Sequence, residues 1–130
     1  MPVRSLSSSV LKWPDRQTVM DAFEEWARHA FLEHPGALRI GCFGSFARKS
    51  DWGVGSDLDI IAITASETEP FERRSAHWDT SALPVPADVV VYSEKEWDAM
   101  MGSRFRSTVD QEAIWINLRI AQHLQRKSNI

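Results

Sequence analysis

The segment that most constrains the fold of this chain is an apolar run that begins with two acidic residues. Residues 57–64 read Asp-Leu-Asp-Ile-Ile-Ala-Ile-Thr, and their β-branched side chains favour a strand. Successive side chains of a strand point to opposite faces, so Asp57 and Asp59 are expected on one face and Leu58 and Ile60 on the other. The segment therefore predicts a buried strand that carries a pair of carboxylates at its start.

Other apolar runs and several amphipathic segments surround this strand. Further strands are predicted at residues 38–43, 87–92 and 113–116. Apolar spacing and capping residues predict helices at residues 15–34, 69–78 and 93–101, a single turn starting at Ser103, and a final helix after Asn117. The alternation of strands and helices predicts an α/β (α+β) fold, with a small mixed β-sheet flanked by helices.

The length and composition limit what this fold can be. With 130 residues, of which 43% are hydrophobic, the chain suffices for one compact domain. We expect residues 1–130 to form that single domain, with residues 1–13 as a flexible leader. A single cysteine, Cys42, excludes an intramolecular disulfide and a cysteine-based zinc cluster.

Charge and hydropathy exclude some classes of partner. The formal net charge is −3, which argues against a protein that binds nucleic acids generally through their phosphates. No apolar run reaches the length of a membrane span. The four histidines have no metal-ligand spacing. A soluble protein of the cytoplasm is expected.

The acidic pair predicts a metal site. Two carboxylates that lie close together repel each other, and a divalent cation such as Mg²⁺, which prefers hard oxygen ligands, removes that penalty. Asp88 opens the next strand and would join Asp57 and Asp59 if the two strands are neighbours.

The segment before the acidic pair predicts a phosphate-binding turn. Gly44-Ser45 follows a strand, and a short turn at residues 46–49 would bring backbone N–H groups and a hydroxyl to one point. Arg48 and Lys49 would add positive charge there. A glycine-containing loop, residues 51–56, joins this turn to the acidic strand.

These motifs resemble a known signature. The stretch GSFARKSDWGVGSDLDI, residues 44–60, is similar to the Gly-Ser, spacer, Asp-x-Asp signature of the DNA polymerase β-like nucleotidyltransferase superfamily. It is most similar to the minimal nucleotidyltransferase family, which typically reads GSxARG, a short loop, then SDxDL. The later ADVVVYS resembles that family's third-aspartate strand. Lys49 departs from the family pattern, which usually has glycine at this position.

The resemblance implies a transferase site. Asp57, Asp59 and Asp88 would be catalytic and would bind one or two Mg²⁺ ions, and Gly44, Ser45, Arg48, Lys49 and Ser56 would bind the nucleotide. An acceptor hydroxyl would attack the α-phosphorus of ATP, receive AMP and release pyrophosphate. In this family the partner is often a HEPN protein, so the resemblance implies an antitoxin that adenylylates a HEPN-type toxin, with a tyrosine hydroxyl as acceptor.

Two other functions stay open from the sequence. The domain could be an antitoxin that neutralises its partner by contact without catalysis. It could also be an adenylyltransferase for a small molecule, in which case a homo-oligomer would complete the pocket. Trp52, in the loop between the two motif halves, is a candidate for stacking on a base or contacting a partner, although core packing is the more common role of such a residue.

Overall fold

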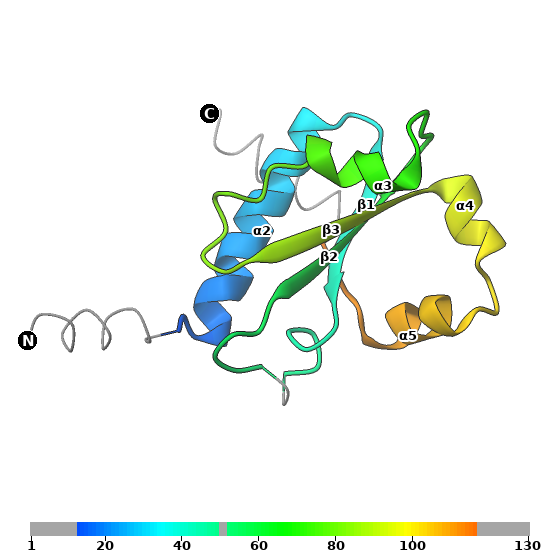
Figure 1. Cartoon of the computed structure of the whole chain (residues 1–130). Coiled ribbons are helices and arrows are strands. Elements are labelled where there is room, and N and C mark those ends of the chain that lie inside the picture. The colour runs from blue at the N-terminus through cyan, green and yellow to red at the C-terminus, as the bar shows by residue number, and fades with distance from the viewer. Residues whose placement is uncertain (1–12, 50–51, 117–130) are drawn as a thin grey trace, which may run out of the picture.

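A four-stranded mixed sheet lies at the centre of the part of the chain that the structure describes (Figure 1). The computed structural model describes residues 13–49 and 52–116. In chain order the elements are α2 (Arg16–Glu33), β1 (Ala37–Phe43), β2 (Leu58–Thr64), α3 (Phe71–Arg74), the 3₁₀ turn η1 (Ser75–His77), β3 (Ala87–Ser93), α4 (Glu94–Ala99), α5 (Arg104–Glu112) and β4 (Ile114–Ile116). The strand order is β3-β2-β1-β4.

The strand directions bring distant segments to one end of this sheet. Strand β1 is antiparallel to both β2 and β4, whereas β2 and β3 are parallel. The carboxyl end of β1 therefore lies beside the amino ends of β2, β3 and β4. We call this the site end, because it carries the predicted Gly-Ser turn and the predicted aspartates. The opposite end carries Thr64 and Ser93, the last residues of β2 and β3.

The two faces of the sheet are covered by different helices (Figure 1). Leu58, Ile60 and Ala62 of β2 belong to the larger apolar cluster, which contains the buried face of α2. Ile61 and Ile63 belong to the second cluster, together with the buried side chains of α4 and α5. This alternation is the period-two pattern of a strand buried on both faces.

Most predicted elements are confirmed. Helix α2 begins after Asp15, whose side chain accepts a hydrogen bond from the Thr18 N–H. Helix α4 begins with the predicted capping box, in which Ser93 and Glu96 bond each other's backbone N–H groups. The mixed sheet with flanking helices is the predicted fold class.

Other boundaries differ from the prediction. The turn predicted after Ser103 is the nine-residue helix α5, with Ser103 as its N-cap, because its buried side chains, Arg106 and Val109, pack against the α4 side of the sheet. The helix predicted at residues 69–78 is the short α3 followed by η1. The predicted helix after Asn117 lies outside the described residues.

The leader prediction falls largely outside the described part of the chain. Residues 1–12 are not described, and Trp13 packs against the larger apolar cluster. Within residues 13–49 and 52–116, no helix is long and apolar enough to cross a membrane.

Candidate functional site

Two of the three predicted aspartates are neighbours across the sheet. Asp59 of β2 pairs in register with Asp88 of β3. Asp59 alternates with the buried residues Leu58 and Ile60, so it shares the face of Ile61, which packs toward α4 and α5. The two aspartates thus occupy matching positions on that face, at the site end, although β2 and β3 are separated by a long connection.

The third aspartate lies just before the strand. Asp57 is exposed and precedes β2, which begins at Leu58, so the prediction that Asp57 and Asp59 share one strand is wrong. The ladder with β1 pairs Phe43 with Asp59 and ends there, because the chain turns at Gly44. Asp57 therefore has no residue of β1 opposite it.

The three carboxylates nevertheless share one electrostatic environment. The pKa of Asp59 is raised above its usual value, mainly by burial and then by the negative charges of Asp88 and Asp57. The positive charge of Arg48 opposes this effect, and Glu112 adds a further negative charge. The site end thus gathers more negative charge than its cations balance.

This donor set suits a hard divalent cation. Carboxylate oxygens are the ligands that Mg²⁺ prefers, and a cation would relieve the repulsion that raises the pKa of Asp59. Asp59 and Asp88, with Asp57 at the rim, are the residues that could hold it. Across the described ranges, no three histidine, cysteine, aspartate or glutamate groups are already arranged around a single point that could hold a metal ion.

The predicted phosphate turn follows β1 directly, and its first residue, Gly44, lies against Asp59. Gly44 has φ +77°, and a side chain at this position would collide with Oδ2 of Asp59. Glycine is therefore required twice, for its backbone conformation and for the close approach of the carboxylate. The Arg48 N–H donates to the Gly44 carbonyl at 3.1 Å, which closes one helical turn as predicted.

Lys49 ends this turn in a conformation that suits glycine better. Its φ is +59°, the left-handed region that side chains with a Cβ disfavour. The backbone conformation at this position is therefore one that suits the glycine of the minimal nucleotidyltransferase pattern, and Lys49 adopts it despite its Cβ. The exposed side chain adds a positive charge beside the turn.

The remaining predicted nucleotide contacts have local roles in the loop. The Ser56 hydroxyl accepts a hydrogen bond from the Gly53 N–H at 3.1 Å. Ser45 is partly buried at the start of the turn. Trp52 packs edge-on against Phe46, with ring centroids 5.1 Å apart, so in this structure it has a packing role.

Two charged residues that sequence reasoning missed hold the turn in place. Glu112, the last residue of α5, accepts hydrogen bonds from the Gly44 N–H and from the Arg48 guanidinium. Arg16, the first residue of α2, donates from Nε to the Phe46 carbonyl at 3.2 Å. Both are remote from the motif in sequence, and neither has a sequence signal of its own.

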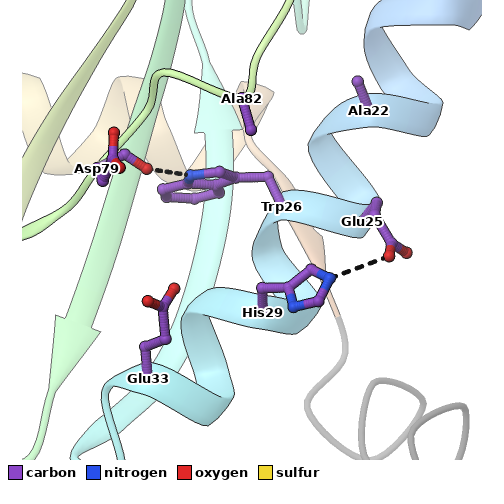
Figure 2. Close-up of a pocket in the computed structure, with 7 residues that line it drawn as sticks. All are labelled: Ala22, Glu25, Trp26, His29, Glu33, Asp79 and Ala82. Atoms are coloured by element: carbon purple, nitrogen blue, oxygen red, sulfur yellow. Dashed lines mark hydrogen bonds and ion pairs between the residues drawn. The ribbon is translucent and has the colours of Figure 1, made fainter.

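A separate cleft lies away from these residues. Figure 2 shows it between α2 and the loop after η1. Its volume is about 480 Å³. The Trp26 indole N–H donates to the Asp79 carbonyl at its edge, and His29 contacts Glu25. A smaller hollow of about 170 Å³ is lined by Asp88 itself, with Ser75, Trp78 and Thr80 among its other residues. Only the smaller hollow contains a predicted site residue.

Comparisons with known proteins bear on the family and the fold of this chain. The sequence pattern of the family described as "Nucleotidyltransferase domain" matches residues 24–116. A crystal structure of a candidate nucleotidyltransferase from Sulfolobus solfataricus is similar to this chain, with a TM-score of 0.53 and 20% sequence identity. The similarity covers 77% of this chain and 80% of that one, and at this identity it concerns the fold. No curated protein sequence matches significantly.

Proposed function

This chain belongs to the nucleotidyltransferase domain family, and we propose that it transfers AMP from ATP to a hydroxyl group with the help of Mg²⁺. The observation that carries the proposal is the pairing of Asp59 with Asp88 beside a glycine turn that touches Asp59. A metal-binding pair and a phosphate-binding turn at one end of a sheet are the two parts that nucleotidyl transfer requires.

Each residue would have a distinct task. Asp59 and Asp88, assisted by Asp57, would hold the cation, which when bound neutralises the triphosphate and polarises the α-phosphoryl group. Ser45 and the N–H groups after it would bind the β- and γ-phosphates, and Arg48 and Lys49 would add positive charge. Ser56 would act at the rim of the loop.

The acceptor would approach from the side of Asp88. Asp88 is exposed and lies on β3, an edge strand of the sheet that the structure describes. The hollow of about 170 Å³ beside it is lined by the hydroxyl-bearing residues Ser75 and Thr80. An exposed carboxylate at an edge can accept a proton from a hydroxyl on a large molecule without a second domain to enclose it.

We further propose that the acceptor is a tyrosine hydroxyl on a HEPN-type partner protein and that the chain is the antitoxin of the pair. The open approach to Asp88 supports a protein acceptor, and the family resemblance supplies the class of partner. An antitoxin that acts by contact alone, and an adenylyltransferase for a small molecule, are the outcomes that the following experiment separates from this proposal.

Intact-mass spectrometry tests the proposal. A candidate HEPN partner would be incubated with this protein, ATP and Mg²⁺, beside an Asp57→Ala, Asp59→Ala variant. A Glu94→Ala, Asp98→Ala variant is the matched control, because it removes two exposed carboxylates from α4. We expect the partner to gain one or more AMP units with the wild type and the control, but not with the site variant.

Two other results would redirect the proposal. No mass gain, with tight binding of the partner to the wild type and to the site variant, would indicate an antitoxin that acts by contact. No gain and no binding would redirect the search to a small-molecule acceptor, added to the same mixture and tested for a gain of AMP.

A further inference from the structure

Glu112 joins the end of α5 to the phosphate turn. Its carboxylate accepts one hydrogen bond from the Gly44 N–H at 2.9 Å and another from Nη1 of Arg48 at 3.0 Å. The Glu112 side chain is only 13% exposed, and its bond to the Gly44 N–H is partly buried, whereas its bond to Arg48 lies at the surface. Charge-assisted hydrogen bonds of this kind are about twice as strong as neutral ones. The contact therefore ties the first residue and the cation of the turn to a different element of the fold.

A second contact holds the opposite side of the turn. Arg16 donates from Nε to the Phe46 carbonyl at 3.2 Å, and its guanidinium lies 4.7 Å from the centre of the Phe46 ring. Phe46 itself is fully buried. The turn is thus fixed by a cation on its carbonyl side and by a carboxylate on its N–H side.

Glu112 also contacts the residue at which the turn lies against Asp59. The turn begins at Gly44, which Asp59 approaches so closely that no side chain fits between them. The same glycine gives its N–H to Glu112. Glu112 therefore acts on the residue through which the turn and β2 meet, and it directs Arg48 at the same time.

We propose that Glu112 is a positioning residue of the nucleotide site, which holds the Gly44 turn and Arg48 in the geometry that receives the triphosphate. This rests on the proposed function. Because the Gly44 N–H bonds to Glu112, the phosphates are bound by Ser45, by the N–H groups that follow it and by the outward part of Arg48. The Arg48 side chain is about half exposed.

The alternative is that Glu112 competes with the phosphates for the same donors. A competing carboxylate would have to leave before the triphosphate binds. The two roles predict opposite effects of removing the side chain, because loss of a positioning contact weakens binding and loss of a competitor strengthens it.

The test compares Glu112→Ala, Glu112→Gln and a matched control, Asp110→Ala. Asp110 lies on the same helix and pairs with Arg106 at 3.0 Å, so its loss also removes a carboxylate and an ion pair. Calorimetry would measure the affinity of each protein for Mg²⁺–ATP and for Mg²⁺–tripolyphosphate, which lacks the nucleoside. Backbone hydrogen exchange of residues 44–49, without any ligand, would report the order of the turn independently. Thermal unfolding would establish that each variant is folded.

We expect Glu112→Ala to weaken both ligands by roughly tenfold and to speed exchange in the turn, as expected for the loss of a charge-assisted contact. Glu112→Gln, which keeps an acceptor oxygen, should fall between it and the wild type, and Asp110→Ala should match the wild type. Tighter binding by Glu112→Ala would overturn the proposal in favour of competition. Unchanged affinity with faster exchange would overturn it in favour of a contact that orders the turn without serving binding. Unchanged exchange would overturn it because Glu112 would then not hold the turn.

Failure of the proposed function gives a different result. Wild-type protein that binds neither Mg²⁺–ATP nor Mg²⁺–tripolyphosphate would contradict nucleotidyl transfer. The positioning role would then fall as well, even if exchange showed that Glu112 orders the turn.

Discussion

The two ends of the sheet carry similar groups of acidic side chains in opposite electrostatic states. At the end opposite the site, Glu96 forms two hydrogen bonds with the Arg74 guanidinium, at 2.7 and 3.0 Å, and Glu67 lies 3.8 Å from the same side chain. These bonds, with the Ser93 N–H, lower the pKa of Glu96 to about 2. At the site end, burial and neighbouring aspartates raise the pKa of Asp59.

The two ends differ in how far positive charge compensates the carboxylates. Arg74 is buried and also donates to the carbonyls of Glu69 and Val91, so its end of the sheet is a closed network. At the site end, Arg48 forms its described hydrogen bonds with Glu112, and its charge offsets only part of the effect of burial and of the neighbouring carboxylates on Asp59. Acidic residues therefore stabilise the Arg74 end of the sheet and destabilise the site end. Carboxylates whose charge is not fully compensated, like those at the site end, are typical of functional sites.

The largest effect should come from removing a carboxylate at the site end. Asp59→Asn keeps the shape of the side chain but removes its charge, so we expect AMP transfer to fall by about 10³-fold or more. The measurement is the initial rate of AMP incorporation into the acceptor identified by mass. Asp98→Asn, on the exposed side of α4, should leave the rate unchanged. An Asp59→Asn variant that kept a tenth of the wild-type rate would show that the charge is dispensable.

Breaking the network at the other end should cost stability rather than activity. Arg74→Met would remove the guanidinium that pairs with Glu96 and Glu67 and that donates to two backbone carbonyls, and we expect it to lower the free energy of unfolding by about 2–3 kcal/mol. Chemical denaturation measures this. A loss below about 0.5 kcal/mol would mean that the network contributes little.

The same comparison predicts a stabilising substitution at the site end. Because the pKa of Asp59 is raised by folding, its ionisation favours the unfolded state. Asp59→Asn should therefore raise the melting temperature in metal-free buffer at pH 7 by roughly a few degrees. The gain should be absent below the usual pKa of an aspartate and should grow as the pH rises through the higher folded value. A variant less stable than the wild type at pH 7 would contradict this sign.

The smallest predicted effect is on the free energy of unfolding at acid pH, through Glu96 at the Arg74 end of the sheet. The pKa of Glu96 is lowered by folding to about 2, so its stabilisation is complete above the usual value of 4.5 and is lost as the pH falls toward 2. Glu96→Gln should lower the free energy of unfolding by about 0.5–1 kcal/mol at pH 7, since the side chain is partly exposed, and the deficit should shrink between pH 4.5 and 2. If the stability deficit of Glu96→Gln did not change with pH, the deficit would arise from altered hydrogen-bond geometry and not from the lost charge.

Much of the fold could be predicted from the sequence because the signals for these elements are local. The apolar, β-branched runs of β2 and β3, the capping box at Ser93 and the helix cap at Asp15 each depend on residues within a few positions of one another. The extent of α5 was missed because much of what stabilises that helix is packing against the sheet, which no local pattern records.

The residues of the site also fall into those that a local sequence signal identifies and those that only the folded chain identifies. Asp59, Asp88 and Gly44 could be predicted from local motifs. They lie close together because β2 is adjacent to both β1 and β3. The place of Asp57 outside β2 depends on where β1 turns. Glu112 reaches Gly44 across 68 residues and Arg16 reaches Phe46 across 30, so only the folded chain identifies them.

The central claim is that the aspartates at the site end form a cation site. The most direct test is the melting temperature of the wild type and of Asp59→Asn, each measured at pH 7 with and without millimolar Mn²⁺ and a non-hydrolysable ATP analogue. The account predicts that the variant is more stable without the ligands, and that the ligands stabilise the wild type strongly and the variant little. Equal stabilisation of the two proteins would contradict the claim, because the ligands would then bind without the charge of Asp59.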